Sequence, residues 1–290
     1  SDNENFNISQ KDIQKIYVKL GNSQEKNFSK IMSRYFNQFY RLLEKNKPNC
    51  IIFLGDRYET LIFGICAKLL NIKIIHFHGG ETTLGSLDNI WRDTISKLSD
   101  YHFTSLKLYK DKLVSLGINK KKIFNVGSIG VANIAKSKIK KKFIFPNNLN
   151  FNRKILVSYH SLTILISQSR KDLNELLNAL SSFKKDFILF TYPGHDFDSD
   201  YIIRSIKNFN KFNKNSMMIK NAKLFSFPTL LKSFDVFVGN SSAGIIEAPT
   251  AKIPTINIGN RQKGRISGKS IFHVPANKKK ITKQIEKVLS

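Results

Sequence analysis

Short apolar runs alternate with longer amphipathic segments along most of the chain. The apolar runs predict strands, at Cys50–Leu54, Lys73–Phe77, Tyr101–Thr104, Ile123–Val126, Ile155–Tyr159, Phe187–Thr191, Val236–Gly239 and Thr255–Ile258. The amphipathic segments predict helices, at Tyr58–Leu70, Asn89–Leu98, Leu106–Leu116, Asp172–Phe183, Asp198–Phe209 and Ser242–Pro249. Strands that are apolar on both faces and separated by helices are typical of parallel sheets covered by helices on both sides.

One segment interrupts this alternation. Residues Ala135–Asn152 are rich in Lys and Asn and contain Pro146, which is typical of a linker. We therefore predict an α/β protein of two doubly wound, Rossmann-like domains, covering residues 1–140 and 141–290. In such sheets a ligand binds outside the carboxyl ends of the strands, so polar motifs that directly follow strands are the candidates for function.

Composition narrows the class of protein. With 290 residues, 41% of them hydrophobic, the chain can bury a sizeable core and is not disordered as a whole. No apolar run approaches the ~18–20 residues that cross a bilayer, and residues 1–10 are too polar for a signal peptide. Cys50 and Cys66 lie in apolar surroundings and match no metal spacing, which favours a reducing compartment and a cytoplasmic location.

The formal net charge of +27 comes mostly from lysines, which occur together with abundant Asn and Ile. This mixture resembles a compositional bias more than a surface selected for phosphate contacts, which would use more Arg and interleaved aromatics. Clusters at Lys120–Lys122, Lys136–Lys142 and Lys278–Lys280 are typical of solvated linkers or helix ends, the alternative being a nonspecific polyanion surface. We expect neither nucleic acid nor a membrane as partner.

Gly55-Asp56-Arg57-Tyr58-Glu59 directly follows the first predicted strand. Gly55 permits a tight turn into the next helix. Asp56 is a good residue for capping that helix, or it places a carboxylate in the crevice at the end of the sheet.

His76-Phe77-His78-Gly79-Gly80-Glu81 follows the second predicted strand. The two histidines face the same way on a strand, but no third ligand follows at a useful spacing, so we expect no metal site. The glycine pair would let the backbone approach a ligand, with Glu81 standing at the end of the strand; a structural loop is the alternative.

If the helix begins at Leu87 and covers Leu87–Leu98, Asp88 and Arg92 lie four residues apart on one face, where they could simply pair with each other. Together with Asp56 and Glu81, Asp88 completes a set of three carboxylates near consecutive strand ends. Clustered carboxylates raise one another's pKa, which suits acid–base chemistry.

Two motifs follow strands in the second half of the chain. His160 is a candidate proton carrier or phosphate ligand, or a structural histidine. The turn Gly239–Pro249 is rich in small and hydroxyl residues and opens a helix, whose free N–H groups can bind phosphate. Glu247 could chelate ribose hydroxyls, the alternative being a surface residue, and Arg261 could add charge for a pyrophosphate.

Together, these motifs resemble the hydrolysing UDP-N-acetylglucosamine 2-epimerases of sialic and legionaminic acid pathways. The resemblance runs in order from about Pro48 to the C-terminus through GDRYE (55–59), HFHGGETTLGSLD (76–88), KLSDYHF (97–103), FNVGS (124–128), GNSSAGIIEAP (239–249) and PTINIGNRQKGR (254–265).

The resemblance implies a GT-B-like fold, with two Rossmann-type domains facing across a cleft and UDP mainly on the second. It implies catalysis by Asp56, Glu81, Asp88 and His160. It implies a substrate or UDP site that includes Arg92, Phe227 near uracil, Asn240, Ser241 and Ser242 at the diphosphate, Gly244, Glu247 at the ribose, and Arg261. No cofactor or metal follows from it, and the partners it implies are a UDP-sugar and further copies of the chain.

The chain departs from the family pattern in several places. Residues 1–49 match neither the family's first strand nor its Gly-Thr-Arg-Ala-Glu-type loop, and the closing C-terminal segment is not present before Ser290. We therefore expect an incomplete first domain, with an exposed sheet edge or hydrophobic face. Further departures are Ser161-Leu162-Thr163 after His160 and Gly194-His195-Asp196 after Tyr192-Pro193.

The expected reaction converts a UDP-2-acetamido sugar, either UDP-GlcNAc or a UDP-2,4-diacetamido-2,4,6-trideoxyhexose, to UDP and the free 2-epimer. It passes through a glycal intermediate. The GDRYE and HGGE forms favour this hydrolysing reaction over a non-hydrolysing epimerase. The same motifs would also suit a UDP-dependent glycosyltransferase or an inactive nucleotide-sugar-binding relative.

Overall fold

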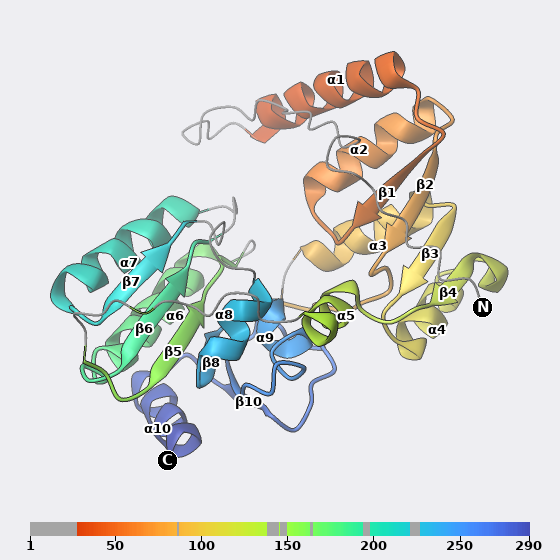
Figure 1. Ribbon diagram of the computed structural model, residues 1–290. Helices are drawn as coiled ribbons and strands as arrows, with labels where there is room; N and C mark the ends of the chain where they lie inside the picture. Colours follow the sequence, from red (N-terminus) through yellow and green to blue (C-terminus); the bar gives the residue numbers. More distant parts are fainter. Residues whose placement is uncertain are drawn as a thin grey trace.

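The computed structural model describes residues 28–85, 87–137, 145, 150–162, 165–193, 198–220 and 227–290. Within them the chain forms two separate parallel sheets (Figure 1). The first has the order β1-β2-β3-β4, formed by Cys50–Leu54, Lys73–Phe77, Tyr101–Thr104 and Ile123–Asn125. The second has the order β10-β9-β8-β5-β6-β7. Its strands are β5 (Lys154–Ser158), β6 (Phe187–Thr191), β7 (Ser216–Ile219), β8 (Val236–Gly239), β9 (Thr255–Ile258) and β10 (Ile271–Val274).

Helices pack on one face of the first sheet and form the N-terminal unit with it. They are α1 (Phe28–Asn46), α2 (Tyr58–Leu69), α3 (Asp88–Leu98) and α4 (Lys107–Ser115). Phe53 and Ile74 point from the sheet into a core that also contains Cys66 of α2 and Ile95 of α3. Burial of these apolar groups is the main stabilising term for the unit.

The opposite face of the first sheet is apolar and exposed in the described structure. Ile52 and Leu54 on the edge strand β1 are 65% and 62% exposed. Phe77, Phe103 and Phe124 stack across β2, β3 and β4, with ring centroids 4.7 and 5.4 Å apart. The expected exposed edge and hydrophobic face are therefore present, whereas the expected second helical layer is not found among the described residues.

The second sheet is covered on both faces and forms the C-terminal unit. Its helices are α6 (Ile166–Leu180), α7 (Ser199–Phe212), α8 (Phe227–Ser233), α9 (Ser242–Ile246) and α10 (Lys278–Leu289). Along β5, Ile155 and Val157 face the core under α6, α7 and α10, and Leu156 faces the core under α8. Burial on both sides explains why this strand is apolar at consecutive positions.

A short helix, α5 (Ile129–Lys136), lies between the two sheets (Figure 1). Its Ile134 is buried in the core of the second sheet beside Leu156 and Phe234. Lys232 of α8 also donates to the carbonyl of Ser137, over 3.0 Å. These contacts join α5 to the C-terminal unit. The predicted division between residues 140 and 141 lies outside the described residues and stays a prediction.

No described helix is long and apolar enough to cross a membrane.

Candidate active site

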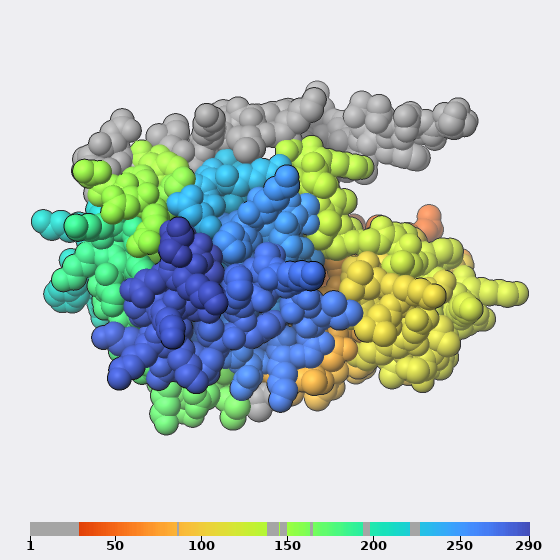
Figure 2. Space-filling view, turned by 90° about the horizontal axis from the view of Figure 1, so that it is seen from below, coloured from red at the N-terminus to blue at the C-terminus, as the bar shows by residue number. Residues whose placement is uncertain are grey.

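The two units meet through a pair of loops. The amide of Leu84, after β2, donates to the carbonyl of Lys263, after β9, over 2.9 Å. A Cβ atom on Gly85 would lie only 2.2 Å from the carbonyl oxygen of Asn260, so a side chain at this position would prevent the contact. Figure 2 shows the blue C-terminal segment lying against the yellow and orange part of the N-terminal unit.

Arg92 of α3 gathers the polar residues that follow β1 and β2. Its guanidinium pairs with the carboxylate of Asp56 and donates to the carbonyl of Glu81 over 2.7 Å and to the Thr83 hydroxyl over 3.3 Å. Arg92 is only 1% exposed, and burial lowers its pKa to about 9, which leaves it charged at neutral pH. It therefore pairs with Asp56 rather than with Asp88, and its contacts are those of a residue that positions Asp56.

The glycine pair of the second motif serves internal packing. A Cβ on Gly79 would lie 2.9 Å from the Ser96 hydroxyl and 3.1 Å from Nδ1 of His76. A Cβ on Gly80, where φ is +78°, would lie 2.4 Å from the carbonyl oxygen of Tyr109. Both glycines thus permit close approach within the N-terminal unit, whereas the sequence suggested an approach to a ligand.

Glu81 is buried and receives three donors. His78 Nδ1 lies 2.7 Å and the Ser105 hydroxyl 3.0 Å from Oε1, and Arg265 of the C-terminal unit pairs with Oε2. Burial alone would raise the pKa of Glu81, but the hydrogen bond from His78 and the charge of Arg265 lower it to about 2. The expectation that clustering raises the pKa of this carboxylate was therefore wrong, because His78 and Arg265 stabilise its ionised form.

Asp88, the first residue of α3, forms a second link between the units. Its Oδ2 lies 3.8 Å from a guanidinium nitrogen of Arg261. Arg261 also donates to the carbonyl of Asn240, over 3.2 Å. This arrangement places a carboxylate of the N-terminal unit beside the Gly239–Pro249 turn of the C-terminal unit.

His160 and Asn240 connect the carboxyl ends of β5 and β8. The amide of His160 donates to Asn240 Oδ1 over 2.7 Å, and Asn240 Nδ2 donates to the carbonyl of His160 over 2.8 Å. The buried Gln262 donates to the carbonyl of Asn240 over 2.9 Å. The side chain of Asn240 is thus occupied in holding the backbone that carries His160.

The turn into α9 follows β8 directly. Ser241 caps this helix by accepting from the amide of Ala243 over 3.4 Å, and Ser242 is its first residue. A Cβ on Gly244 would lie 2.7 Å from the ring of Phe237, so this glycine lets α9 pack tightly on the sheet. The two serines are therefore placed at a helix start beyond a strand end, where an anion can bind.

Glu247 lies at the end of α9 and faces the N-terminal unit. Its Oε1 would lie 2.5 Å from a Cβ on Gly130 of α5. Burial raises its pKa, against the nearby charges of His78 and Arg265, which lower it. Its buried Oε2 has no hydrogen-bond partner in the described structure. The sequence placed Glu247 at a ribose and gave no sign that it lies near the charges around Glu81.

Two residues of this junction were not singled out from the sequence, Gln262 and Arg265, and His78 was considered there only as a metal ligand and not as a partner of Glu81. Arg265 and Gln262 lie in the GNRQKGR stretch, which contributed only Arg261 to the predicted site. Phe227 opens α8 and packs partly against the core under that helix, and the preceding residues 221–226 are outside the described structure. Thr163 and residues 194–197, where two departures from the family pattern fall, are also outside it.

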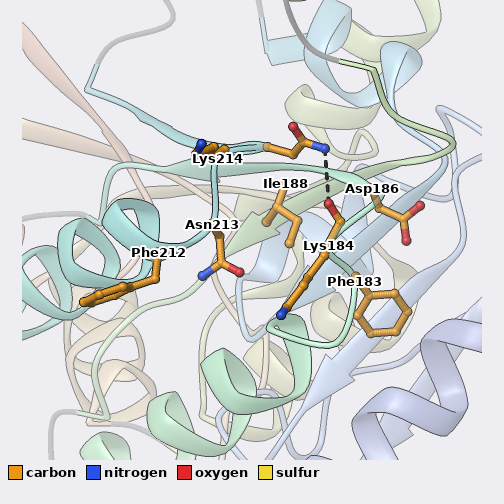
Figure 3. A pocket seen from close by; sticks show the side chains of 8 residues that line it. Phe183, Lys184, Asp186, Ile188, Phe212, Asn213 and Lys214 are labelled. Atoms are coloured by element: carbon orange, nitrogen blue, oxygen red, sulfur yellow. Dashed lines mark hydrogen bonds between the residues drawn. The ribbon is translucent and has the colours of Figure 1, made fainter.

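A separate hollow of about 250 Å³ lies at the opposite end of the second sheet, where β6 begins (Figure 3). Its lining includes Phe183, Ile188 and Phe212. Because it lies at the amino end of β6, we do not assign it to the candidate active site.

A family model described as UDP-N-acetylglucosamine 2-epimerase matches residues 3–290. The chain belongs to this family. Similar curated proteins include "Polysialic acid biosynthesis protein P7" of Escherichia coli, 35% identical over 97% of this chain and 72% of that protein. "GDP/UDP-N,N'-diacetylbacillosamine 2-epimerase (hydrolyzing)" of Campylobacter jejuni is 33% identical over 94% of this chain and 74% of that protein.

Solved structures of this epimerase family share the fold. The putative UDP-N-acetylglucosamine 2-epimerase of Listeria monocytogenes superposes with a TM-score of 0.73 at 18% identity, covering 92% of this chain and 71% of that one. The Neisseria meningitidis UDP-GlcNAc 2-epimerase, solved with UDP-GlcNAc bound, gives 0.72 at 16% identity, covering 96% and 76%. The predicted family and GT-B-like fold are thereby confirmed, whereas the roles of the individual site residues stay predictions.

Proposed function

We propose that this epimerase-family chain is a hydrolysing 2-epimerase that converts a UDP-2-acetamido sugar to UDP and the free 2-epimer. The observation that carries the proposal is the meeting of two kinds of group at one junction. Glu81 and Asp88 of the N-terminal unit pair with Arg265 and Arg261 of the loop beside the Gly239–Pro249 turn. A sugar can thus face carboxylates while its nucleotide lies on the C-terminal unit.

The chemistry requires both kinds of group. A base removes the proton from C2, the bond from C1 to the diphosphate oxygen breaks, and a C1=C2 double bond forms. Water then supplies a hydroxyl to C1, and C2 regains a proton on the opposite face. Because the C2–H of a sugar is a weak acid, proton removal must be coupled to departure of the diphosphate, whose growing charge needs hydrogen-bond donors.

The surroundings of the carboxylates support different roles for them. Glu81, with a pKa of about 2, is suited to remain ionised and stabilise positive charge in the site, and it is a weak base. Asp56 and Asp88 are the candidates for proton transfer, with His160 beside the leaving group. Arg92 acts by positioning Asp56.

For the nucleotide, we propose that Ser241, Ser242 and Arg261 bind the diphosphate, Glu247 the ribose, and Phe227 the uracil. The contacts of Asn240 and Gly244 favour supporting roles: Asn240 holds the backbone of His160, and Gly244 packs α9. Hydrolysis, rather than return of UDP to the glycal, is supported by the Campylobacter relative and by a Legionella pneumophila relative at 30% identity, both named as hydrolyzing.

Product analysis tests the proposal. Purified protein is incubated with UDP-GlcNAc and, separately, with its 2,4-diacetamido-2,4,6-trideoxy analogue in D2O. The expected products are UDP and a free 2-epimer that carries deuterium at C2. A UDP-linked epimer would instead identify a non-hydrolysing enzyme, a requirement for an acceptor would identify a transferase, and UDP binding without turnover would identify an inactive relative.

We also propose that the chain forms a homo-oligomer, as the family resemblance implies. Light scattering coupled to size-exclusion chromatography measures this directly, and a mass of 33.3 kDa would contradict it.

A further inference from the structure

The loop after β9 reaches the N-terminal unit with a charged side chain that the reaction scheme above does not use. We propose that Arg265 is a positioning residue of the epimerase: it holds Glu81 ionised and oriented, and only while this loop is docked on the N-terminal unit. The inference rests on the proposed function, because Glu81 is placed there in the catalytic site.

The contact between Arg265 and Glu81 is a buried ion pair. The two side chains are 7% and 4% exposed, so water screens their charges little. Both oxygens of Glu81 are occupied, Oε1 by His78 and Ser105 and Oε2 by Arg265. No other described residue donates to Oε2, so the orientation of the carboxylate depends on Arg265.

Arg265 is in place because the loop itself is docked. Lys263, two residues before Arg265, accepts the backbone hydrogen bond from the Leu84 amide, and Gly264 between them has a φ of +87°. A Cβ on Gly264 would lie 3.0 Å from Leu84 and 3.3 Å from Thr82, so the loop is closely packed where it turns toward Glu81. Any separation of the two units therefore withdraws the Arg265 guanidinium from Glu81.

The Nε atom of Arg265 is available to a bound ligand. Its Nε is buried and has no hydrogen-bond partner in the described structure, and neither does Oε2 of Glu247 in the same cluster. Buried donors without acceptors are rare in native proteins, and a bound ligand often completes them. An oxygen of the bound sugar nucleotide would supply the acceptor for Nε.

The charged groups facing Glu81 come from several elements. His78 follows β2, Arg265 lies in the docked loop, and Glu247 comes from the end of α9. Arg92 contributes through the carbonyl of Glu81. Loss of Arg265 would leave His78 as the main group that favours ionised Glu81, with the negative Glu247 opposing it.

The first test compares Arg265→Met and Arg265→Lys with Arg170→Met, which removes an exposed pair with Asp198 in the same unit. Arg265→Met should lower kcat about 100-fold, because small misplacements of a site carboxylate have effects of this size. It should also shift the acidic limb of the pH profile upward, since Glu81 then binds a proton more readily. Arg265→Lys should recover part of kcat, and Arg170→Met should match the parent.

Two results would overturn the proposal. One is an unchanged kcat and pH profile in Arg265→Met. The other is a loss of UDP affinity, measured by calorimetry, with no change in the pH profile, which would assign Arg265 to the diphosphate rather than to Glu81.

The second test does not depend on turnover. Cys50 is an exposed free thiol and Cys66 a buried one, so a spin label reacts at Cys50, and Lys171→Cys on α6 provides an exposed second site. The distance distribution between the labels should be narrow in the parent and broader in Gly85→Val, whose side chain would clash with the Asn260 carbonyl where the two loops meet. An equally narrow distribution in Gly85→Val would contradict docking of the loop on the N-terminal unit, whereas a broadened distribution in a protein without epimerase activity would support docking and reject the proposed function.

Discussion

Nε2 of His76 lies 2.9 Å from the carbonyl oxygen of Gly55, while its Nδ1 lies 3.1 Å from the hydroxyl of Ser96. A carbonyl oxygen only accepts, so Nε2 carries the hydrogen and the Ser96 hydroxyl donates to Nδ1. Neutral His76 therefore joins the end of β1 to α3. The same helix, α3, also carries Arg92, which pairs with Asp56. Ser96 and Arg92 of α3 therefore both hold the turn at the end of β1, Ser96 through His76 and Arg92 through Asp56.

We expect stability to fall as the pH decreases from about 6.5 to 4. Burial lowers the pKa of His76 and of His102 to about 4, so the folded state resists protons that the unfolded chain binds. The stabilisation is complete above the unfolded pKa and is lost on acidification; for His76 it amounts to roughly 3 kcal/mol at 1.36 kcal/mol per pKa unit. Urea unfolding at several pH values measures this, and constant stability between pH 7 and 4 would contradict it.

Amide substitutions in the acidic trio should separate catalysis from nucleotide binding. Asp56→Asn, Glu81→Gln and Asp88→Asn are each expected to lower kcat by about 10²–10⁴-fold, the usual range for loss of an acid–base or charge-stabilising group. UDP affinity should change little, because the proposed nucleotide site lies on the other unit. Asp111→Asn, on the exposed surface of α4, is the matched control. If all three variants had the kcat of the parent, these carboxylates would have structural rather than catalytic roles.

Glu247→Ala should weaken UDP binding by roughly 1–3 kcal/mol, because ribose hydroxyls would lose their buried partner. Titration calorimetry with UDP measures the change. Glu44→Ala, on the exposed side of α1, should bind UDP like the parent. Equal affinities of both variants would remove Glu247 from the nucleotide site.

Gly79→Ala should destabilise the N-terminal unit by about 1–3 kcal/mol, as overpacking in a filled core does. The added methyl group would lie 2.9 Å from the Ser96 hydroxyl. Adding Ser96→Ala removes that oxygen but also the hydroxyl that donates to His76, so it should recover only part of the loss. Gly268→Ala is the control, because a Cβ there meets nothing within 4 Å. Thermal unfolding of the four proteins checks the order, and equal values for Gly79→Ala and Gly268→Ala would refute the packing argument.

The strands that the sequence predicted best are the apolar ones. The predicted and observed bounds of β1, β2, β3, β6, β8 and β9 coincide, because a continuous apolar run between turn residues leaves little choice of where the strand begins and ends. In contrast, β7 begins at a serine, β10 contains the exposed His273, and the sequence predicted neither strand. Lys278–Lys280, predicted as a solvated linker or a helix end, begin α10, but the sequence analysis did not predict that Ile281 and Ile285, four residues apart, bury one face of this helix.

Only part of the site could be predicted. The position of Asp56, Glu81 and Asp88 near strand ends made them candidates from the sequence, because topology brings the ends of parallel strands together. The partner of Glu81 is 184 residues away in the chain, and no local pattern indicates such a pair. Likewise, sequence alone does not distinguish a glycine that faces a ligand from one, such as Gly79, that packs against Ser96.

The stacked phenylalanines beside the β1 edge affect how the molecule behaves in solution. An apolar surface next to a strand edge that no described residue pairs with favours self-association. The net charge of +27 opposes it, since two copies repel each other before these surfaces can meet. Added salt screens that repulsion over a Debye length of ~10 Å at 0.1 M but leaves the apolar attraction in place. Solubility of this protein should therefore decrease as ionic strength rises.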